Sequence, residues 1–147
     1  MPKRIVVAEK AAPPGGPYSH AVVAGDFAYL AGACPVLPDG TWVRGDFAAQ
    51  ARAAFDNLAR VAEAAGGDLG SAVRVGVYLR DFADFPAMNE IYQEYFGTEN
   101  LPARTTLPVA LNGFDIEVDA VLYLGDQAVS GGSERDGSES GPTAADQ

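Results

Sequence analysis

Residues 46–79 read DFAAQARAAFDNLARVAEAAGGDLGSAVRVGVYL, and they decide the fold class of this 147-residue chain. Apolar side chains recur at helical spacing through Asp46–Ala65, with Asp46 placed to cap the first turn and Gly66 placed to stop the last one. The run Val73–Leu79 is short and rich in valine, which is typical of a buried strand. An amphipathic helix that leads into a strand predicts a layered protein in which helices cover a sheet.

The segments on either side supply the remaining elements. Two turns, Gly25-Asp26 and Asn112-Gly113, are predicted to close β-hairpins, and the second is the stronger signal. The loop Ala11–Pro17 contains three prolines and two glycines, which exclude regular strand pairing. Further strands are predicted at Lys3–Ala8, His20–Ala24, Phe27–Gly32, Thr105–Leu111 and Phe114–Leu124, and a second helix at Asp84–Phe96 with Asp84 as its N-cap.

The order β-β-β-α-β-α-β-β predicts an α+β fold with one mixed sheet of about six strands and two helices on one face. The strands carry apolar residues on both sides, as in the neighbouring pairs Val22 and Val23 or Val121 and Leu122. Two helices can cover only one side of such a sheet. We therefore expect the chain to associate with copies of itself.

Charge and composition limit the classes of partner. The chain carries a formal net charge of −10, and its polar Gly/Ser-rich end accounts for −3 of this, which leaves −7 on the rest. We expect one domain over 1–128 and a disordered acidic tail over 129–147. A negative domain repels phosphate backbones and anionic lipid, so neither nucleic acid nor a membrane is expected as a partner. No signal peptide or long apolar segment is evident, which favours a cytoplasmic protein.

Three residues are candidates for chemistry. Arg104 enters an apolar strand, where a partly buried guanidinium needs a carboxylate; the partner is either a core acid or a small carboxylate-bearing substrate. Glu117 lies on the strand face opposite Ile116 and Val118, as a general acid or base or as part of a solvated face. Tyr18 follows the rigid proline loop and either points into a pocket or packs the loop down.

The remaining chemistry-bearing residues give weaker signals. Asn89 lies near the start of the second helix and is ordinarily an exposed helical residue. Cys34 and His20 are the single cysteine and the single histidine, and no nucleophile signature surrounds them. One cysteine excludes an intrachain disulfide and a cysteine-based zinc site, and no set of metal ligands is evident.

Taken together, five short motifs resemble the RidA family of enamine/imine deaminases, also called YjgF. They are GPYSHAV at 16–22, FAYLAG at 27–32, FPAMNEIY at 85–92, LPARTT at 101–106 and IEV at 116–118. They occur in the family's order and span most of the expected domain.

The resemblance implies a chorismate-mutase-like fold, a homotrimer with clefts between subunits, and cofactor-free hydrolysis of imines or enamines of the 2-aminoacrylate type to 2-oxo acids and ammonia. It implies that Arg104 binds the substrate carboxylate and that Glu117 activates water, with Tyr18 lining the pocket. Asn89 and Thr106 would support substrate binding.

The sequence departs from the family pattern at four positions. His20 stands in place of a glutamine, Ala31 of a serine, Ala33 of a glutamine and Thr106 of a frequent cysteine. These changes favour a larger or less polar substrate, and Ala31 is counted with Asn89 and Thr106 among the substrate-binding residues. Alternatives are a pathway-specific enzyme acting on one specialised intermediate, and a non-catalytic binding or chaperone-like trimer or a nuclease.

Overall fold

The computed structural model describes residues 2–125, so the predicted tail at 129–147 and the domain boundary at 128 lie outside the described residues. The strands are β1 (Arg4–Val6), β2 (Ala21–Ala24), β3 (Phe27–Ala33), β4 (Ala72–Leu79), β5 (Ala103–Pro108) and β6 (Ile116–Tyr123), and the helices are α1 (Phe47–Ala64) and α2 (Phe85–Phe96). Two short 3-10 turns, Leu69–Ser71 and Phe82–Asp84, precede β4 and α2.

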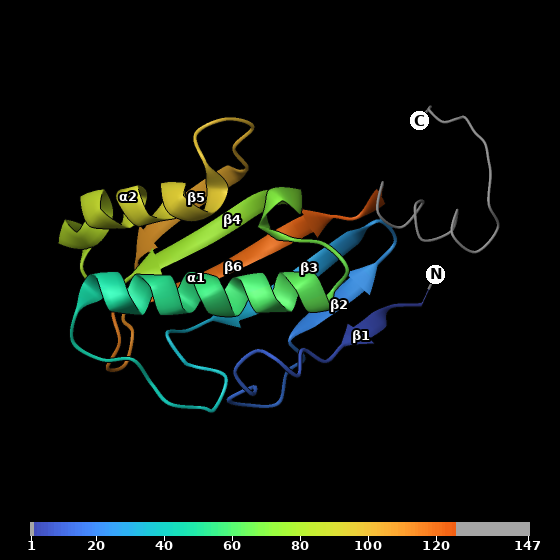
Figure 1. Ribbon diagram of the computed structural model, residues 1–147, viewed down its shortest axis with the longest axis horizontal. Helices are drawn as coiled ribbons and strands as arrows, with labels where there is room; N and C mark the ends of the chain where they lie inside the picture. Colours follow the sequence, from blue (N-terminus) through green and yellow to red (C-terminus); the bar gives the residue numbers. More distant parts are fainter. Residues whose placement is uncertain (1, 126–147) are drawn as a thin grey trace.

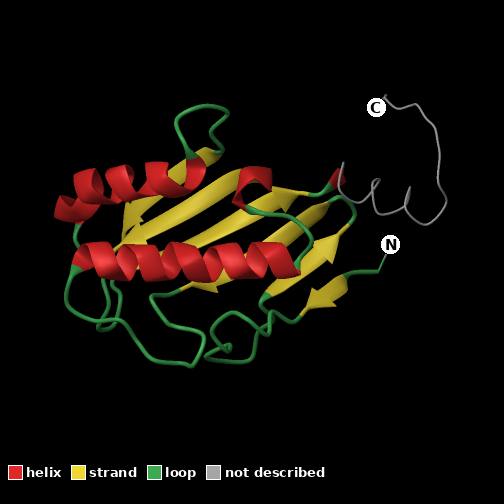
Figure 2. Cartoon of the chain, viewed as in Figure 1, coloured by secondary structure: helices red, strands yellow, loops and turns green. Residues whose placement is uncertain are grey.

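The six strands form one sheet in the order β1-β2-β3-β6-β4-β5, in which the β4–β5 pair is parallel and the other pairs are antiparallel. Both helices lie against the same face of this sheet (Figures 1 and 2). The predicted α+β architecture is confirmed. In residues 2–125, no helix combines the length and the apolar character needed to cross a membrane.

Alternation of the strand side chains places the core under the helices. Val75, Val77 and Leu79 of β4 are fully buried. The side chains of Phe55 and Leu58 from α1 lie on the same side of the sheet and are also fully buried. Burial of these side chains is the main favourable term for a domain of this size, at about 25 cal/mol per Å² of apolar surface. β4 therefore forms the centre of the helix-covered half of the sheet.

The helix ends show where local prediction succeeds and where it fails. Asp46 caps α1, because its carboxylate accepts a hydrogen bond from the Ala49 backbone N–H at 2.9 Å. Asp84 does not cap α2 through its side chain, because its backbone is already helical. The cap lies earlier, at Asp81, which accepts from the Ala83 N–H at 2.9 Å and starts the 3-10 turn that leads into α2.

The hairpin at Gly25-Asp26 is confirmed, with Ala24 opposite Phe27 and φ +60° at Gly25. The hairpin predicted at Asn112-Gly113 is wrong, because β4 lies between β5 and β6 and pairs with both. Gly113 still makes a tight turn, with φ +88°. The Asn112-Gly113 dipeptide predicts a local reversal of the backbone. It does not predict which strand pairs with β5 or β6, because both pair with the buried apolar strand β4.

The other side of the sheet, which we call the open face, carries no helix in residues 2–125. Phe27, Tyr29, Leu107 and Tyr123 alternate onto it and are 37–49% exposed. The rings of Phe27 and Tyr123 lie 5.5 Å apart and form one apolar surface. Such a patch is the kind of surface that a second chain covers, so self-association remains a prediction.

Candidate active site

Glu117 lies half-buried on the open face of β6, as strand alternation predicted. Its Oε1 accepts a hydrogen bond from the Cys34 thiol at 3.6 Å, and its Oε2 lies directly over Gly32, where a Cβ would overlap it. The neighbouring acids are engaged elsewhere: Asp115 is 2.7 Å from Arg80, and Asp119 accepts from the Tyr78 hydroxyl at 3.1 Å. Within residues 2–125, Glu117 belongs to no ion pair.

The Cys34 thiol acts as a donor to this carboxylate. Burial first, and then the charge of Glu117 and the hydrogen bond to it, together raise the pKa of Cys34 to about 12. A thiol with that pKa is protonated at neutral pH and is a poor nucleophile. The geometry agrees with the sequence argument against cysteine catalysis.

The loop before β2 is held by His20, which sequence reasoning considered as a partner for Cys34 and as a departure from the family pattern. The Ala8 N–H donates to Nδ1 at 3.0 Å, so that nitrogen carries no proton, and Nε2 then donates to the Ala12 carbonyl at 2.8 Å. Both ring nitrogens are therefore occupied by backbone groups. His20 forms no pair with Cys34, and it fixes the loop that carries Tyr18.

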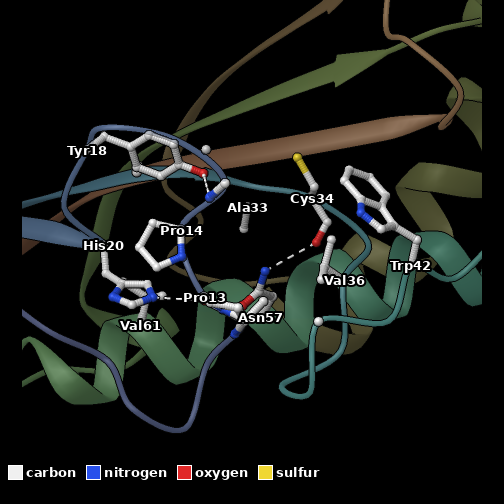
Figure 3. A pocket seen from close by; sticks show the side chains of 15 residues that line it. Pro13, Pro14, Tyr18, His20, Ala33, Cys34, Val36, Trp42, Asn57 and Val61 are labelled. Carbon is white, nitrogen blue, oxygen red and sulfur yellow. Dashed lines mark hydrogen bonds between the residues drawn. The ribbon is translucent and has the colours of Figure 1, made fainter.

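Tyr18 is half exposed, and its hydroxyl oxygen accepts a hydrogen bond from the Gly15 N–H at 2.9 Å. Its ring forms one wall of a cavity of about 240 Å³ that Ala31 and Cys34 also line. Figure 3 shows Tyr18 on one side of this cavity and Val36 and Trp42 on the other. The predicted residues Tyr18 and Ala31 are thus brought together with the surroundings of Glu117.

Arg104 lies on the edge strand β5 and points toward α2. Its guanidinium carbon lies 4.7 Å from the Tyr92 ring centroid and 5.7 Å from that of Phe85. Asn89 lies four residues after Phe85 and three before Tyr92, so it shares their helix face. A flat cation over two rings keeps its planar edge available to an anion.

Arg104 is half-buried and belongs to neither of the two ion pairs found in residues 2–125, which join Arg52 to Glu94 and Arg80 to Asp115. Sequence analysis left open a core acid or an external anion as its partner. The described part of the chain supplies no core acid. Thr106 follows on the same side of β5, two residues further along the strand.

The site residues form two separate groups in one chain. Arg104 pairs in register with Val75 on the helix-covered face, whereas Glu117 is opposite Tyr78 on the open face, with β4 between their strands. Strand pleating therefore directs Arg104 and Glu117 to opposite sides of the sheet. Within one chain, the Arg104 group and the Glu117 group therefore lie on different faces of the sheet.

Three further cavity residues were not singled out from the sequence: Val36, Trp42 and Asn57. Asn57 had a usable signal, because it is a polar residue between Ala54 and Val61 on the apolar face of the predicted helix. Val36 and Trp42 gave none, since a loop residue reveals its neighbours only in the folded chain. Within the described residues, no group of three or more metal-ligating side chains comes together.

Comparison with known proteins identifies relatives over nearly the whole described chain. The family model described as endoribonuclease L-PSP matches residues 9–124. A RutC family protein of Pyrococcus abyssi is 42% identical over 126 residues, which cover 84% of this chain and 98% of that protein. A human 2-iminobutanoate/2-iminopropanoate deaminase is 37% identical over 126 residues, covering 84% of this chain and 91% of the relative.

Solved structures show the same fold. The crystal structure of the YjgF gene product of E. coli superposes with a TM-score of 0.75 at 34% identity, covering 82% of this chain and 98% of that one. The crystal structure of RidA from an Antarctic Psychrobacter gives a TM-score of 0.77 at 34% identity, with the same coverage of 82% and 98%. Similarity at this level extends over the strands and helices that carry both groups of site residues.

Proposed function

This chain belongs to the RidA/YjgF family, which includes imine deaminases, and on that premise we propose that it is a cofactor-free hydrolase of reactive 2-imino acids and their enamine forms. The products are a 2-oxo acid and ammonia. The proposal depends on two charged groups that have no ion-pair partner among residues 2–125. One is the Arg104 guanidinium, which is stacked on Tyr92, and the other is the half-buried Glu117 carboxylate.

Arg104 binds the substrate carboxylate through its planar fork of N–H donors. This interaction fixes the neighbouring iminium carbon, which is already electrophilic when the nitrogen is protonated. Asn89 and Thr106 lie on the same side of the site as Arg104 and support substrate binding. Tyr18 and Ala31 form the opposite wall of the site. When the substrate and the attacking water are both held in position, hydrolysis becomes an effectively unimolecular step.

Glu117 takes a proton from water as the water oxygen bonds to the iminium carbon and the C=N electron pair moves to nitrogen. The same carboxyl group returns that proton to the amino nitrogen of the tetrahedral intermediate. The C–N bond then breaks, the C=O bond forms, and the hydroxyl proton leaves with ammonia as ammonium. The Cys34 thiol, 3.6 Å from Oε1, holds the carboxylate in place during both transfers.

We propose further that the two groups meet between neighbouring copies in a homotrimer. The apolar open face, with Phe27, Tyr29 and Tyr123 exposed, supports association through the sheet. In a closed ring, each chain can give its Arg104 group to one neighbour and its Glu117 group to the other. This arrangement accounts for the placement of Arg104 and Glu117 on opposite sides of the sheet.

A mixing experiment tests both parts of the proposal. An amino-acid oxidase generates 2-iminopropanoate, and its loss is followed by the fall in trapped semicarbazone. Arg104→Ala and Glu117→Gln are each expected to be inactive as pure oligomers. Co-expression of the two variants is expected to restore roughly a quarter of the wild-type sites, because random assembly places two intact groups together in that fraction.

Two results would contradict the proposal. Wild-type protein that leaves the lifetime of 2-iminopropanoate unchanged would rule out the activity. Co-assembled variants that stay inactive, with mixed oligomers verified by differently tagged chains, would rule out a site shared between Arg104 of one chain and Glu117 of another.

The principal alternative is a pathway-specific member of the family that acts on one specialised intermediate. It is favoured by Ala31 and Ala33, which stand where polar residues would line the cavity. A rate on 2-iminopropanoate far below that on larger imines would support it.

A further inference from the structure

The cavity beside Glu117 is built from four segments that are far apart in the sequence. The proline loop supplies Pro14 and Tyr18, the end of β3 supplies Ala31 and Ala33, the loop after it supplies Val36 and Trp42, and α1 supplies its floor. Figure 3 shows Ala33 between the Tyr18 and Trp42 walls. Carbon atoms of these side chains form most of the lining.

Three polar side chains that line this cavity, those of Asn57, His20 and Tyr18, already have partners in the protein. Asn57 accepts from the Ala12 N–H at 3.1 Å and donates to the Cys34 carbonyl at 3.2 Å, and His20 bonds two backbone groups. The Tyr18 hydroxyl accepts from the Gly15 N–H. Among the residues that the structure describes, no charged side chain lines the cavity. A ligand group that enters it therefore loses water without gaining a charged partner, which selects an apolar group.

The cavity adjoins the carboxylate that activates water in the proposed function. Gly32 and Cys34 belong to the cavity wall and also touch Glu117: Oε2 lies over Gly32, and the Cys34 sulfur is 3.6 Å from Oε1. A substrate carbon placed for attack beside Glu117 thus stands at the rim of an apolar space. The substituent on that carbon is the part of the substrate that can enter.

The size of the cavity distinguishes between substituents. Its volume is about 240 Å³. An apolar cavity of roughly 150 Å³ is enough to hold a benzene ring. A methyl group would leave most of the space empty, whereas a phenyl or an isobutyl group would occupy much more of it and remove its own apolar surface from water.

We propose that this cavity binds the substrate side chain, and that the preferred substrates are 2-imino acids with an aromatic or branched aliphatic side chain. The proposal rests on the imine-hydrolase function argued above and adds a substrate class to it. Ala31 and Ala33 enlarge the cavity, because each leaves space that a larger polar side chain would occupy. Val36 and Trp42 contribute the apolar wall that faces Tyr18.

The Trp42 wall is held in position by its own neighbours. Its ring lies 5.0 Å from the Phe114 ring, and the Arg44 guanidinium lies over it at 5.1 Å. Arg44 in turn donates to the Gly113 carbonyl at 2.7 Å. A backbone bridge joins Val36 to Trp42, so the two wall residues are fixed relative to each other. The cavity is therefore preformed before any ligand binds.

The test measures kcat/KM of the full-length protein for imines generated in place from alanine, leucine and phenylalanine. We expect the phenylalanine- and leucine-derived imines to exceed the alanine-derived imine by about tenfold or more, since each methylene in an apolar pocket contributes roughly a tenfold factor or greater. Val36→Trp fills the cavity and is expected to lower kcat/KM on the phenylalanine- and leucine-derived imines more than on the alanine-derived imine, so that this preference is lost. Leu37→Trp adds the same side chain at the adjacent exposed position and serves as the matched control.

A binding measurement makes the test independent of turnover. Phenylpyruvate, the product of the phenylalanine-derived imine, is expected to raise the melting temperature more than pyruvate at equal concentration, and Val36→Trp is expected to abolish that difference. Trp42→Ala, at a wall that is 38% exposed, opens the cavity without overpacking and is expected to reduce the preference if Val36→Trp does not fold.

The outcomes separate the two proposals. Hydrolysis of the alanine-derived imine with equal or slower rates on the larger imines overturns the side-chain pocket and leaves the imine-hydrolase function standing. Equal losses on all three imines in Val36→Trp also overturn the pocket. Absence of activity on every imine overturns the function itself and the pocket with it.

Discussion

Gly32→Ala tests the role of Glu117 without changing any charged group. Gly32 does not have a positive φ, so alanine strains no backbone there, but its Cβ would overlap the Glu117 carboxylate oxygen and lie 3.0 Å from the carboxyl carbon. An ordinary contact needs ~3.5–4.0 Å, so the carboxyl carbon must move by at least roughly 0.5–1 Å and the overlapping oxygen further. A misplacement of that order can cost about 100-fold in rate, and we expect kcat to fall by about 10- to 100-fold.

The expected signature is a loss of rate without a loss of stability. The displaced atoms are the far end of a flexible side chain, which can rotate away at little energetic cost. We therefore expect the melting temperature of Gly32→Ala to stay close to that of the wild type. The semicarbazone assay gives kcat, and thermal denaturation gives the melting temperature, on the same preparation.

Gly76→Ala is the matched control, because a Cβ there would overlap Asp119 and crowd the Tyr78 hydroxyl on the same open face. It disturbs an acid that the proposed mechanism does not use, so kcat should change little while the oligomer stays intact by size-exclusion chromatography. A Gly32→Ala variant with wild-type kcat would refute the placement of Glu117 at the reacting carbon. Equal losses in both variants would attribute the effect to the sheet as a whole.

Three further predictions follow from named contacts. Arg104→Lys keeps the charge but loses the planar group stacked on Tyr92, so KM for 2-iminopropanoate should rise about tenfold or more in steady-state kinetics, and an unchanged KM would contradict carboxylate binding there. Asp46→Ala removes the α1 cap and should lower the free energy of unfolding in urea by about 1 kcal/mol, whereas asparagine at this position should retain most of it. Burial first, and Glu117 second, raise the pKa of Cys34 from 9.0 to about 12, so stability should be fully present below pH 9 and fall as pH rises toward 12. Urea unfolding between about pH 9 and 10.5 should show a downward slope that is weaker in Cys34→Ala, and identical slopes would contradict it.

Local signals predicted most of the elements correctly. The α1 helix, its Asp46 cap and the β2–β3 turn at Gly25 depend on residues within a few positions of each other, so periodicity and turn chemistry were sufficient. Asp84 is the N-cap residue of α2, as predicted, but its side chain makes no capping hydrogen bond, and Asp81 caps the 3-10 turn that precedes the helix. The 3-10 turn follows the end of β4, and its position depends on where that strand ends in the sheet. Local sequence patterns do not predict this.

The candidate site was accessible from the sequence only in part. Residue chemistry and the family resemblance named Arg104, Glu117 and Tyr18. The structure adds the thiol of Cys34 against Glu117, and the two backbone bonds by which His20 fixes the Tyr18 loop. Trp42 is missed from sequence because it lies in a loop without periodicity, and its neighbours come from other elements.

Local patterns in the sequence were enough to assign the helices and strands. They also predicted which side of β6 carries Glu117, and that the side chain of Arg104 is partly buried at the start of a strand. These are properties of one segment, fixed by backbone periodicity and the alternation of side chains. Only the tertiary structure placed β4 between β5 and β6, and with it Arg104 and Glu117 on opposite sides of the sheet. The reason is that strand pairing is chosen by the total apolar surface the whole chain can bury, and the Asn112-Gly113 turn adapts to that choice.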